Sequence, residues 1–233
     1  MNKTILFGGS GHLGSNILKN LKCISPRHNE IDLSKYSDME NNSIFSNANT
    51  VIHSAGYVNT EGCEDDPNKC LENNVMSTYN LVKICRSKNI KLIYISSEYV
   101  FDGESSEYRP SSPVCPKNIY GLCKASSEFL VKTLKNYLII RAPFIRTDNF
   151  IYPSAFKDQY TVRQYVGKVA KDIARCITSG ETGIKHIVGK YQSVYDLAKK
   201  TNSNVLPANS LFNNSMPTDV SMNLNKLINE EDE

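Results

Sequence analysis

A tyrosine and a lysine stand four residues apart in the stretch NIYGLCK, as Tyr120 and Lys124. In a helix, this spacing places the two side chains one turn apart on the same face. A phenol loses its proton at about pH 10, and a neighbouring ammonium group lowers that pKa because it stabilises the phenolate. The pair could therefore provide an acidified tyrosine for proton transfer. The spacing alone is common, so the surrounding elements decide whether the pair has this role.

A glycine-rich stretch, FGGSGHLG, lies between the first apolar run and the first helical stretch. Gly8, Gly11 and Gly14 satisfy GxxGxxG, and Gly9 in place of Gly8 satisfies GxGxxG. Such a turn lets the backbone approach a pyrophosphate, whose charge meets the N–H groups at the start of the helix. The stretch therefore predicts a dinucleotide-binding turn. The residues expected to contact the cofactor there are Gly8, Ser10, Gly11, His12, Leu13 and Gly14.

Four short apolar runs alternate with stretches of helical periodicity along the first 143 residues. Because the runs are almost continuously apolar, they are typical of parallel strands that are covered on both faces. We therefore predict an α/β fold, a Rossmann-type doubly wound parallel sheet. The predicted strands cover 4–7, 50–55, 90–96 and 137–143, with a rudimentary strand at 22–25, and the predicted helices cover 12–21, 67–88 and 121–134.

The pattern loosens beyond Pro143. A helix is expected at 166–177, a short strand at 184–189, another helix at 193–200, and an irregular tail from Ser203. A chain of 233 residues is long enough for one complete core. We therefore expect a single NAD(P)-binding domain over 1–233, in which about 143–233 contributes a reduced substrate-binding lobe.

Polar and small residues follow the strands of the predicted sheet. HSAGY comes after the second apolar run and SSEY after the third. Doubly wound sheets bind ligands at the carboxyl ends of their strands. The Ser97 hydroxyl, with Ser96 as its alternative, is therefore expected to meet Tyr120 and Lys124 in one crevice.

Composition excludes several classes of function. The net charge of +3 is too small to argue for a nucleic-acid or membrane partner. Seven dispersed cysteines form no CxxC pair, and the four histidines lack metal-ligand spacing, so neither a disulfide framework nor a metal site is expected. We see no signal peptide or membrane span and expect a cytoplasmic protein.

Several stretches, in order, resemble the extended short-chain dehydrogenase/reductases, and within them the dTDP-4-dehydrorhamnose reductases. They are GGSGHLG, VIHSAGYVNTEGCEDDP, NNVMSTYNL, ISSEYVFDG and NIYGLCK. The YVFDG stretch directly after the serine pair is the most specific of them. The resemblance is continuous over about 1–175 and implies reduction of the 4-keto group of a nucleotide-linked 6-deoxy sugar, with a homodimer as one arrangement.

The resemblance assigns roles to individual residues. Tyr120 matches the proton donor, Lys124 the lysine that acidifies it and holds the nicotinamide ribose, and Ser97 the residue that hydrogen-bonds the substrate carbonyl. Asn74 matches an asparagine of the long helix. The small residues that pass beside the cofactor ribose are Ser54, Ala55 and Gly56, and Tyr57 is included with them, although packing would explain it equally well.

The choice between NADP(H) and NAD(H) depends on two residues after the weak strand. Asp32 lies where an acid would bind the adenosine ribose of NAD. In related sugar-nucleotide reductases, however, an Asp–Leu pair lies beside the adenine, which would make Asp32 and Leu33 adenine contacts. Arg27 would then meet the 2′-phosphate of NADP. We favour NADP(H), with NAD(H) as the alternative.

The chain also departs from the family. It is short in the C-terminal part, Glu98 stands where an aspartate is usual, and the stretch QYTVRQYV lacks the glycine of a GTPT-like motif. Two other functions are therefore kept open: a bifunctional 3-epimerase/4-reductase of a UDP- or GDP-linked sugar, and a non-catalytic regulatory subunit like the β subunit of methionine adenosyltransferase. An epimerase needs a further acid/base, for which Glu98, Cys115, Lys157 and Asp158 are the candidates.

Overall fold

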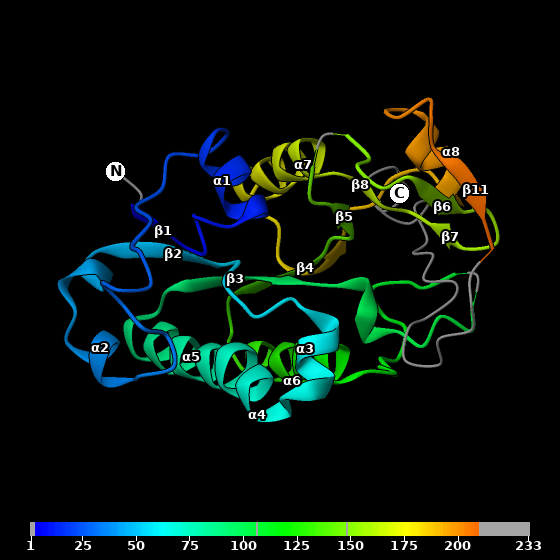
Figure 1. The fold of residues 1–233 in the computed structure, drawn as a ribbon. Coiled ribbons are helices and arrows are strands. Elements are labelled where there is room, and N and C mark those ends of the chain that lie inside the picture. Colours follow the sequence, from blue (N-terminus) through cyan, green and yellow to red (C-terminus); the bar gives the residue numbers. More distant parts are fainter. Residues whose placement is uncertain (1–2, 106, 148, 210–233) are drawn as a thin grey trace.

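The computed structural model describes residues 3–105, 107–147 and 149–209. Its centre is a five-stranded, wholly parallel sheet with the spatial order β1–β2–β3–β4–β9 (Figure 1). The strands are β1 (Lys3–Phe7), β2 (Ala48–His53), β3 (Lys91–Ser96), β4 (Tyr137–Arg141) and β9 (Gly183–His186). The predicted fold class and these five strands are confirmed.

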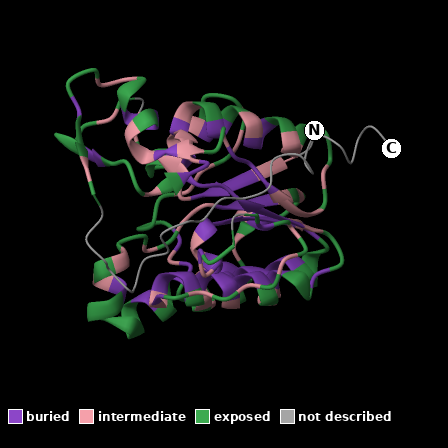
Figure 2. Cartoon of the chain, turned by 90° about the vertical axis from the view of Figure 1, so that its right-hand side faces the viewer, coloured by how far each residue is buried: buried purple, intermediate pink, exposed green. Residues whose placement is uncertain are grey.

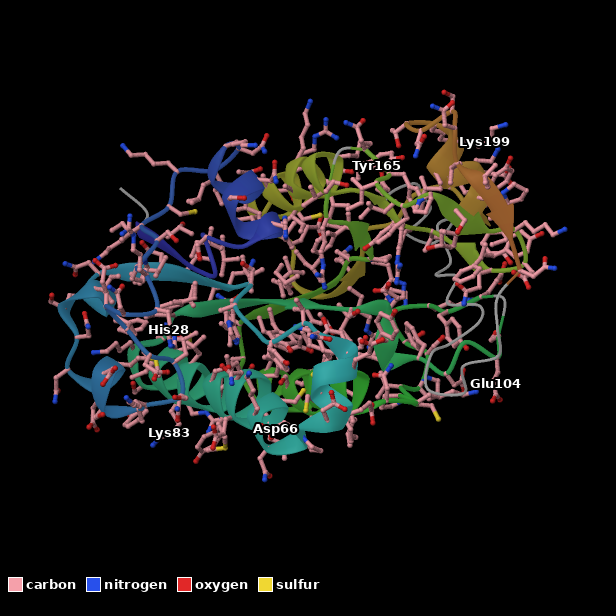
Figure 3. The ribbon with its side chains drawn as sticks, in the orientation of Figure 1. His28, Asp66, Lys83, Glu104, Tyr165 and Lys199 are labelled. Carbon is pink, nitrogen blue, oxygen red and sulfur yellow. The ribbon has the colours of Figure 1, made fainter. Side chains whose placement is uncertain are left out.

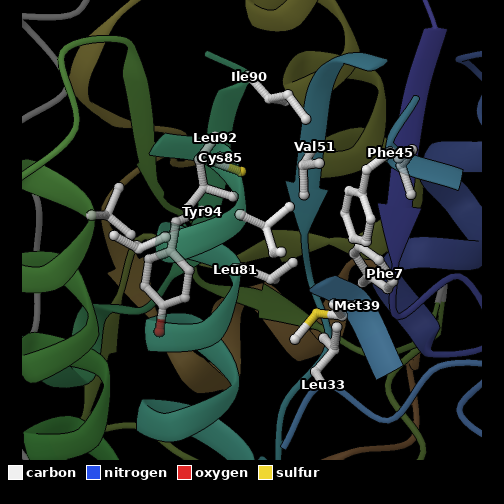
Figure 4. Packing of buried hydrophobic residues seen from close by; sticks show 14 of the residues in the cluster. Phe7, Leu33, Met39, Phe45, Val51, Leu81, Cys85, Ile90, Leu92 and Tyr94 are labelled. Atoms are coloured by element: carbon white, nitrogen blue, oxygen red, sulfur yellow. The ribbon is translucent and has the colours of Figure 1, made fainter. Parts of the chain in front are cut away.

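Helices cover both faces of the sheet. Successive side chains of a strand point to opposite faces, so each strand contributes to both helical layers. Ile5 and Val51 face the layer that contains α5 and α6, whereas Leu6 and Ile52 face the layer that contains α1 and α7. Figure 2 shows the buried residues concentrated in the sheet and on the inner sides of the helices, and Figure 4 shows the packing of the first layer. The helices are α1 (His12–Leu18), α5 (Ser77–Lys88), α6 (Ile119–Lys132) and α7 (Val166–Thr178).

The rudimentary strand expected at 22–25 is reduced to one β-bridge, between Ile24 and Ile5. The Leu6 amide donates to the Ile24 carbonyl at 2.8 Å, and the Ile24 amide donates to the Thr4 carbonyl at 2.9 Å. After the bridge, the chain makes only α2 (Ser37–Glu40) and the short 3₁₀ helix η1 (Ser43–Phe45) before β2. The segment between the bridge and β2 is therefore shorter than a full βαβ unit.

The helix predicted at 67–88 is present over these bounds, but it is not α-helical throughout. It begins as α4 (Pro67–Cys70), widens into the π-helix η2 (Leu71–Met76) and continues as α5, and α3 (Thr60–Asp65) precedes it. Within η2, the Asn74 carbonyl accepts hydrogen bonds from the hydroxyls of Thr78 at 2.6 Å and Ser127 at 3.1 Å. Hydroxyls that reach a main-chain carbonyl compete with the regular helical ladder, and π-helical turns often lie at functional sites.

Residues 143–209 contribute α7 and β9 to the main layers and otherwise form a smaller lobe at one end of the molecule (Figure 1). Its strands pair in twos: β5 (Phe144–Ile145) with β8 (Gln164–Tyr165), β6 (Ser154–Phe156) with β11 (Leu206–Ala208), and β7 (Tyr160–Thr161) with β10 (Gln192–Ser193). The predicted helix at 193–200 is present as α8 (Val194–Lys199). The tail that was expected to be irregular from Ser203 includes β11, and the rest of it, residues 210–233, lies outside the described residues.

Candidate active site

A cleft of about 360 Å³ lies at the carboxyl ends of β1 and β2. This is the edge of a doubly wound sheet where ligands bind. Nine of the residues expected to contact a cofactor line the cleft: Gly8, Ser10, Gly11, Asp32, Leu33, Ser54, Ala55, Gly56 and Tyr57. His12, Leu13 and Gly14 belong to the first turn of α1, which starts directly after the lining residue Gly11.

The turn before α1 requires glycine at position 8. Gly8 has φ +90°, and a Cβ built on it would lie 2.5 Å from the Ala55 nitrogen. The β1–α1 turn and the segment after β2 therefore approach each other at backbone distance. A bare backbone cradle with amides around it is what a dinucleotide pyrophosphate needs, so the residues present fit that group.

Asn74 fixes the segment that follows β2. Its amide oxygen accepts the Tyr57 N–H at 2.9 Å, and its amide nitrogen donates to the Tyr57 carbonyl at 2.9 Å. Because Asn74 is 2% exposed and pairs with both main-chain groups of one residue, it holds that residue as a neighbouring strand would. Tyr57 lines the cleft and also packs against the core cluster of Cys63, Cys70, Tyr120 and Cys123, so this cluster adjoins the cleft.

The two residues that bear on cofactor choice lie differently. Asp32 lines the cleft, and its Oδ1 accepts the amide and hydroxyl of Ser34 at 3.0 and 2.7 Å. The hydrogen bond from the Ser34 hydroxyl is the main reason that the pKa of Asp32 is lowered. Arg27 is exposed and is not part of the cleft wall, whereas its neighbours Pro26 and His28 are. Figure 3 shows His28 at the end of the molecule away from Lys199.

The structure brings Ser97, Tyr120 and Lys124 together. Ser97 is the N-cap of the 3₁₀ helix η3 (Glu98–Val100), and Tyr120 and Lys124 lie one turn apart in α6, with the Lys124 Nζ 6.0 Å from the Tyr120 ring centre. A Cβ built on Gly121 would lie 2.1 Å from the Tyr99 carbonyl oxygen, so only glycine lets α6 approach η3 this closely. This contact brings the Tyr120 phenol close enough to Ser97 for the serine to lower the pKa of the phenol.

Local signals explain where α6 begins. The Asn118 side chain accepts the Gly121 N–H at 2.7 Å, as an N-cap asparagine does, and the Glu64 carboxylate accepts the Ile119 N–H at 2.7 Å. The Asn118 side chain and the Glu64 carboxylate thus satisfy N–H groups that the start of a helix leaves unpaired. Tyr120 is therefore positioned by the first turn of a capped helix.

The expected acidification of Tyr120 is not found in the structure. Burial raises the pKa of Tyr120 well above its usual value and the Glu98 carboxylate raises it further, while a hydrogen bond with Ser97 opposes both. Burial also lowers the pKa of Lys124 to about 8, against the pull of the Glu128 carboxylate. The Lys124 Nζ donates to the Ile95 carbonyl at 2.7 Å. Desolvation of the phenol thus outweighs the ammonium group one turn away.

Ser96, the alternative to Ser97, belongs to a different cluster. Its hydroxyl donates to Glu128 Oε1 at 2.6 Å, and the same carboxylate forms a bidentate ion pair with Arg141 at 2.9 and 2.7 Å. Glu128 and Arg141 are each 1% exposed. Ser96 therefore helps to fix the sheet and α6, and Ser97 is the serine that faces Tyr120.

Arg163 is the residue of this site that the sequence did not single out. Its guanidinium forms an ion pair with Glu98 at 2.8 Å, directly behind Ser97. It belongs to the QYTVRQYV stretch, which the sequence marked only as a departure from the family pattern. No local signal in that stretch places an arginine beside η3, because the two segments lie 65 residues apart.

Two further properties concern what the described part of the chain contains. Among residues 3–105, 107–147 and 149–209, no group of three or more His, Cys, Asp or Glu side chains is placed to hold a metal ion. Within the same ranges, none of the helices has both the length and the apolar character needed to cross a membrane.

The chain resembles several characterised proteins. It is 28% identical to a dTDP-4-dehydrorhamnose reductase of Aggregatibacter actinomycetemcomitans over 85% of this chain and 77% of that one. It is 26% identical to a probable low-salt glycan biosynthesis reductase of Haloferax volcanii over 60% of this chain and 54% of that protein. It is 34% identical to the β subunit of methionine adenosyltransferase 2 of Xenopus laevis, over 42% of this chain and 30% of that one. The chain thus spans about half the length, or less, of several of its relatives.

Solved structures share the fold. The dTDP-4-dehydrorhamnose reductase of Bacillus anthracis in complex with NADP superimposes with a TM-score of 0.86, at 23% identity, over 98% of this chain and 93% of that one. Residues 1–205 match the family model described as the RmlD substrate binding domain. Because this match extends across the sheet, the cleft and the lobe, the chain belongs to the RmlD substrate-binding-domain family.

Proposed function

We propose that this protein is an NADPH-dependent reductase of a nucleotide-linked 4-keto-6-deoxy sugar. The observation that carries the proposal is that Tyr57, which lines a cleft whose Gly8 turn admits a pyrophosphate, packs against the core cluster that contains Tyr120, the neighbour of Ser97 and Lys124. The relative of Aggregatibacter actinomycetemcomitans, named for this reaction, supports the choice of substrate class. The sugar and its nucleotide are left open.

Different residues of the cleft would contact different parts of the cofactor. The turn from Gly8 to Gly14 holds the pyrophosphate, Asp32 and Leu33 flank the adenosine half, and the segment from Ser54 to Tyr57 runs beside the ribose. Lys124 is close enough to Tyr120 to serve the nicotinamide ribose and the phenol together. A nicotinamide bound in this way supplies the hydride for the ketone carbon and, once oxidised, a positive charge near the phenol.

The chain's own residues handle the proton. Negative charge grows on the ketone oxygen as its carbon is reduced, and Tyr120 donates its proton to that oxygen. The raised pKa of Tyr120 keeps this proton on the phenol at neutral pH, which suits a general acid. Because the pKa of Lys124 is lowered to about 8, its ammonium group can release a proton near neutral pH. Lys124 can therefore help to return a proton to Tyr120.

Glu98 bears on the epimerase alternative. A base that removes a proton beside the ketone must have a carboxylate oxygen available, yet both Glu98 oxygens accept hydrogen bonds, one from Ser97 and one from Arg163. Cys115 is exposed in the loop before α6. We therefore propose reduction without proton exchange at the carbons flanking the ketone.

The regulatory alternative rests on the relatives named as subunits of methionine adenosyltransferase. They are 34–35% identical to this chain but over only 41–42% of it, so the similarity is concentrated in one part of the chain. Such a protein would bind the dinucleotide and leave it unchanged, which makes NADPH turnover the discriminating property.

The experiment combines both questions. The protein is incubated with a 4-keto-6-deoxy nucleotide sugar in heavy water, first without and then with NADPH, and the sugar is followed by mass spectrometry. We expect NADPH consumption with loss of the ketone, and no enzyme-dependent deuterium uptake before NADPH is added. Uptake at the flanking carbons would favour the epimerase, and NADPH binding without turnover of dTDP-, UDP- or GDP-linked substrates would favour the regulatory subunit.

A further inference from the structure

The Glu98 carboxylate lies behind the proposed active site and has two different partners. Its Oε2 accepts the Ser97 hydroxyl at 2.8 Å, and its Oε1 accepts Nε and Nη2 of Arg163 at 3.0 and 2.8 Å. The Glu98 side chain is 5% exposed. A carboxylate buried this deeply is costly unless a cation and hydrogen bonds compensate it, and here each oxygen has its own compensation.

Arg163 reaches this carboxylate from the small lobe. It lies between β7 and β8, and its main-chain N–H is fixed by the Thr161 hydroxyl at 3.1 Å. Its Nη2 also donates to the Tyr99 hydroxyl at 3.3 Å, so the guanidinium contacts the two residues that follow Ser97. Glu98 and the QYTVRQYV stretch therefore meet in one ion pair.

Glu98 determines the direction of the Ser97 hydroxyl. A serine has one O–H proton, and in this structure that proton is donated to Glu98. The Ser97 oxygen is then left to accept hydrogen bonds, as it does from the Tyr99 N–H at 3.3 Å. The carboxylate thus sets which face of Ser97 is presented to the Tyr120 phenol.

Glu98 also affects the phenol through its charge. Its carboxylate is the second contribution, after burial, that raises the pKa of Tyr120. Other titratable groups around the phenol are Tyr99 on η3, Cys63 on α3, Tyr94 on β3, and Lys124 one turn along α6. Arg163 is the cation among the groups hydrogen-bonded to the Glu98 carboxylate. Its positive charge therefore reduces the effect of the carboxylate charge on the Tyr120 phenol.

We propose that Arg163 is a positioning residue of the active site, which neutralises Glu98 so that this carboxylate orients Ser97 without leaving a bare charge beside Tyr120. Arg163 hydrogen-bonds Glu98 and Tyr99, and it acts on Ser97 through Glu98. The catalytic part of this inference rests on the proposed function, whereas the neutralisation of Glu98 does not.

The first test measures neutralisation in the protein without cofactor or substrate. In Arg163→Gln, Glu98 becomes an unpaired buried carboxylate, so its pKa in the folded state rises above the unfolded value of about 4.3. A raised acid pKa stabilises the fold below the unfolded pKa and loses that contribution as pH increases. The Tm deficit of the variant should therefore grow between pH 5 and pH 8, reaching roughly 10 °C.

Matched variants separate charge from packing. Glu98→Gln in the Arg163→Gln background removes the stranded carboxylate, so the growth of the deficit with pH should disappear. Arg163→Lys keeps the cation and should show little growth with pH. Arg175→Gln removes an exposed arginine that pairs with Asp172 at 3.1 Å on α7 and serves as the control for the loss of a surface ion pair. A deficit for Arg163→Gln that is equal at pH 5 and pH 8 would overturn the proposal.

The second test measures positioning during turnover. Arg163→Gln should lower kcat by about 10- to 100-fold with less change in KM, because the misplaced groups act on the reacting oxygen. Its pH–rate profile should shift to higher pH, and Glu98→Gln should partly reverse that shift. If kcat and the profile match wild type, Arg163 has no positioning role. If wild type itself does not turn over, the proposed function fails while the stability series still decides whether Arg163 neutralises Glu98.

Discussion

Residues 3–142 and residues 143–209 are built on different principles. The first region has four of the five central strands, with side chains such as Leu6, Val51 and Ile93 fully buried between two helical layers. Apart from α7, α8 and β9, the second region consists of strand pairs two or three residues long, and its own core is made of Ala155, Ala198 and Val205. Large apolar side chains remain exposed there, including Ile151 at 67% and Leu206 at 64%.

Because the two regions are packed differently, they have different roles. Fully buried aliphatic side chains each contribute about 1.5–3 kcal/mol, which suits a rigid support for the cofactor. Small side chains and two-residue strand pairs contribute less, so the lobe depends on a few long-range contacts such as Arg163 with Glu98. We infer that substitutions in the first region act on cofactor and chemistry, whereas those in the lobe act on alignment.

The largest effect is expected for Tyr120→Phe, which removes one oxygen from the first region. Loss of a general acid costs about 10²–10⁴-fold in rate. The fold and the affinity for NADPH should be nearly unchanged, because the ring still packs against Tyr99 with its centre 5.8 Å away. Tyr79→Phe, which alters a tyrosine that is 43% exposed on α5, is the control. Full turnover by Tyr120→Phe would contradict the mechanism.

A somewhat smaller effect is expected for Gly8→Ala, which tests the glycine turn. The new Cβ would lie 2.5 Å from the Ala55 nitrogen, so the turn must move and NADPH affinity should fall by about 100-fold, or ~2.7 kcal/mol. Gly180→Ala is a matched control, because Gly180 has a similar φ of +82° but no atom within 4 Å of the added carbon. Backbone strain alone should cost both variants about 1 kcal/mol of stability, and equal NADPH affinities would refute the assignment of the turn.

The sequence predicted the first region well because its signals are local. Apolar runs located the strands, and FGGSGHLG located the turn. The π-helical turn at Asn74 was missed because it depends on hydroxyls from Thr78 and Ser127, one of them on another helix. The raised pKa of Tyr120 and the Glu98–Arg163 pair depend on burial and on long-range contacts, which spacing along the chain does not encode.

Lys124→Met tests the buried ammonium group of the first region through stability. The folded pKa of Lys124 is about 8, below its usual value of 10.5, so keeping the lysine protonated costs stability at neutral pH. That cost disappears as pH rises from about 8 to 10.5, and wild type should gain roughly 3 kcal/mol on the variant over this range. Unfolding by denaturant at pH 7.5 and pH 10 measures the change. A stability difference that is independent of pH would show that Lys124 has an ordinary pKa.

The smallest effect concerns cofactor preference at the rim of the cleft. We expect Arg27→Ala to weaken NADPH binding by about tenfold and to leave NADH binding unchanged, because a guanidinium recognises a phosphate group. His28→Ala is the companion variant, since His28 lines the cleft and Arg27 does not. Fluorescence titration with both cofactors decides whether Arg27 or His28 recognises NADPH. A loss of NADPH affinity confined to His28→Ala would assign this role to the histidine.

Hydride transfer through the Tyr120 site is the central claim, and isotopic labelling tests it most directly. The protein is given NADPH that carries deuterium at both positions of nicotinamide C4, together with a 4-keto-6-deoxy nucleotide sugar. We expect the reduced sugar to gain one deuterium with wild type, and we expect Tyr120→Phe to form this product at least 100-fold more slowly. Bound NADPH that transfers no label to a panel of dTDP-, UDP- and GDP-linked ketones would contradict it.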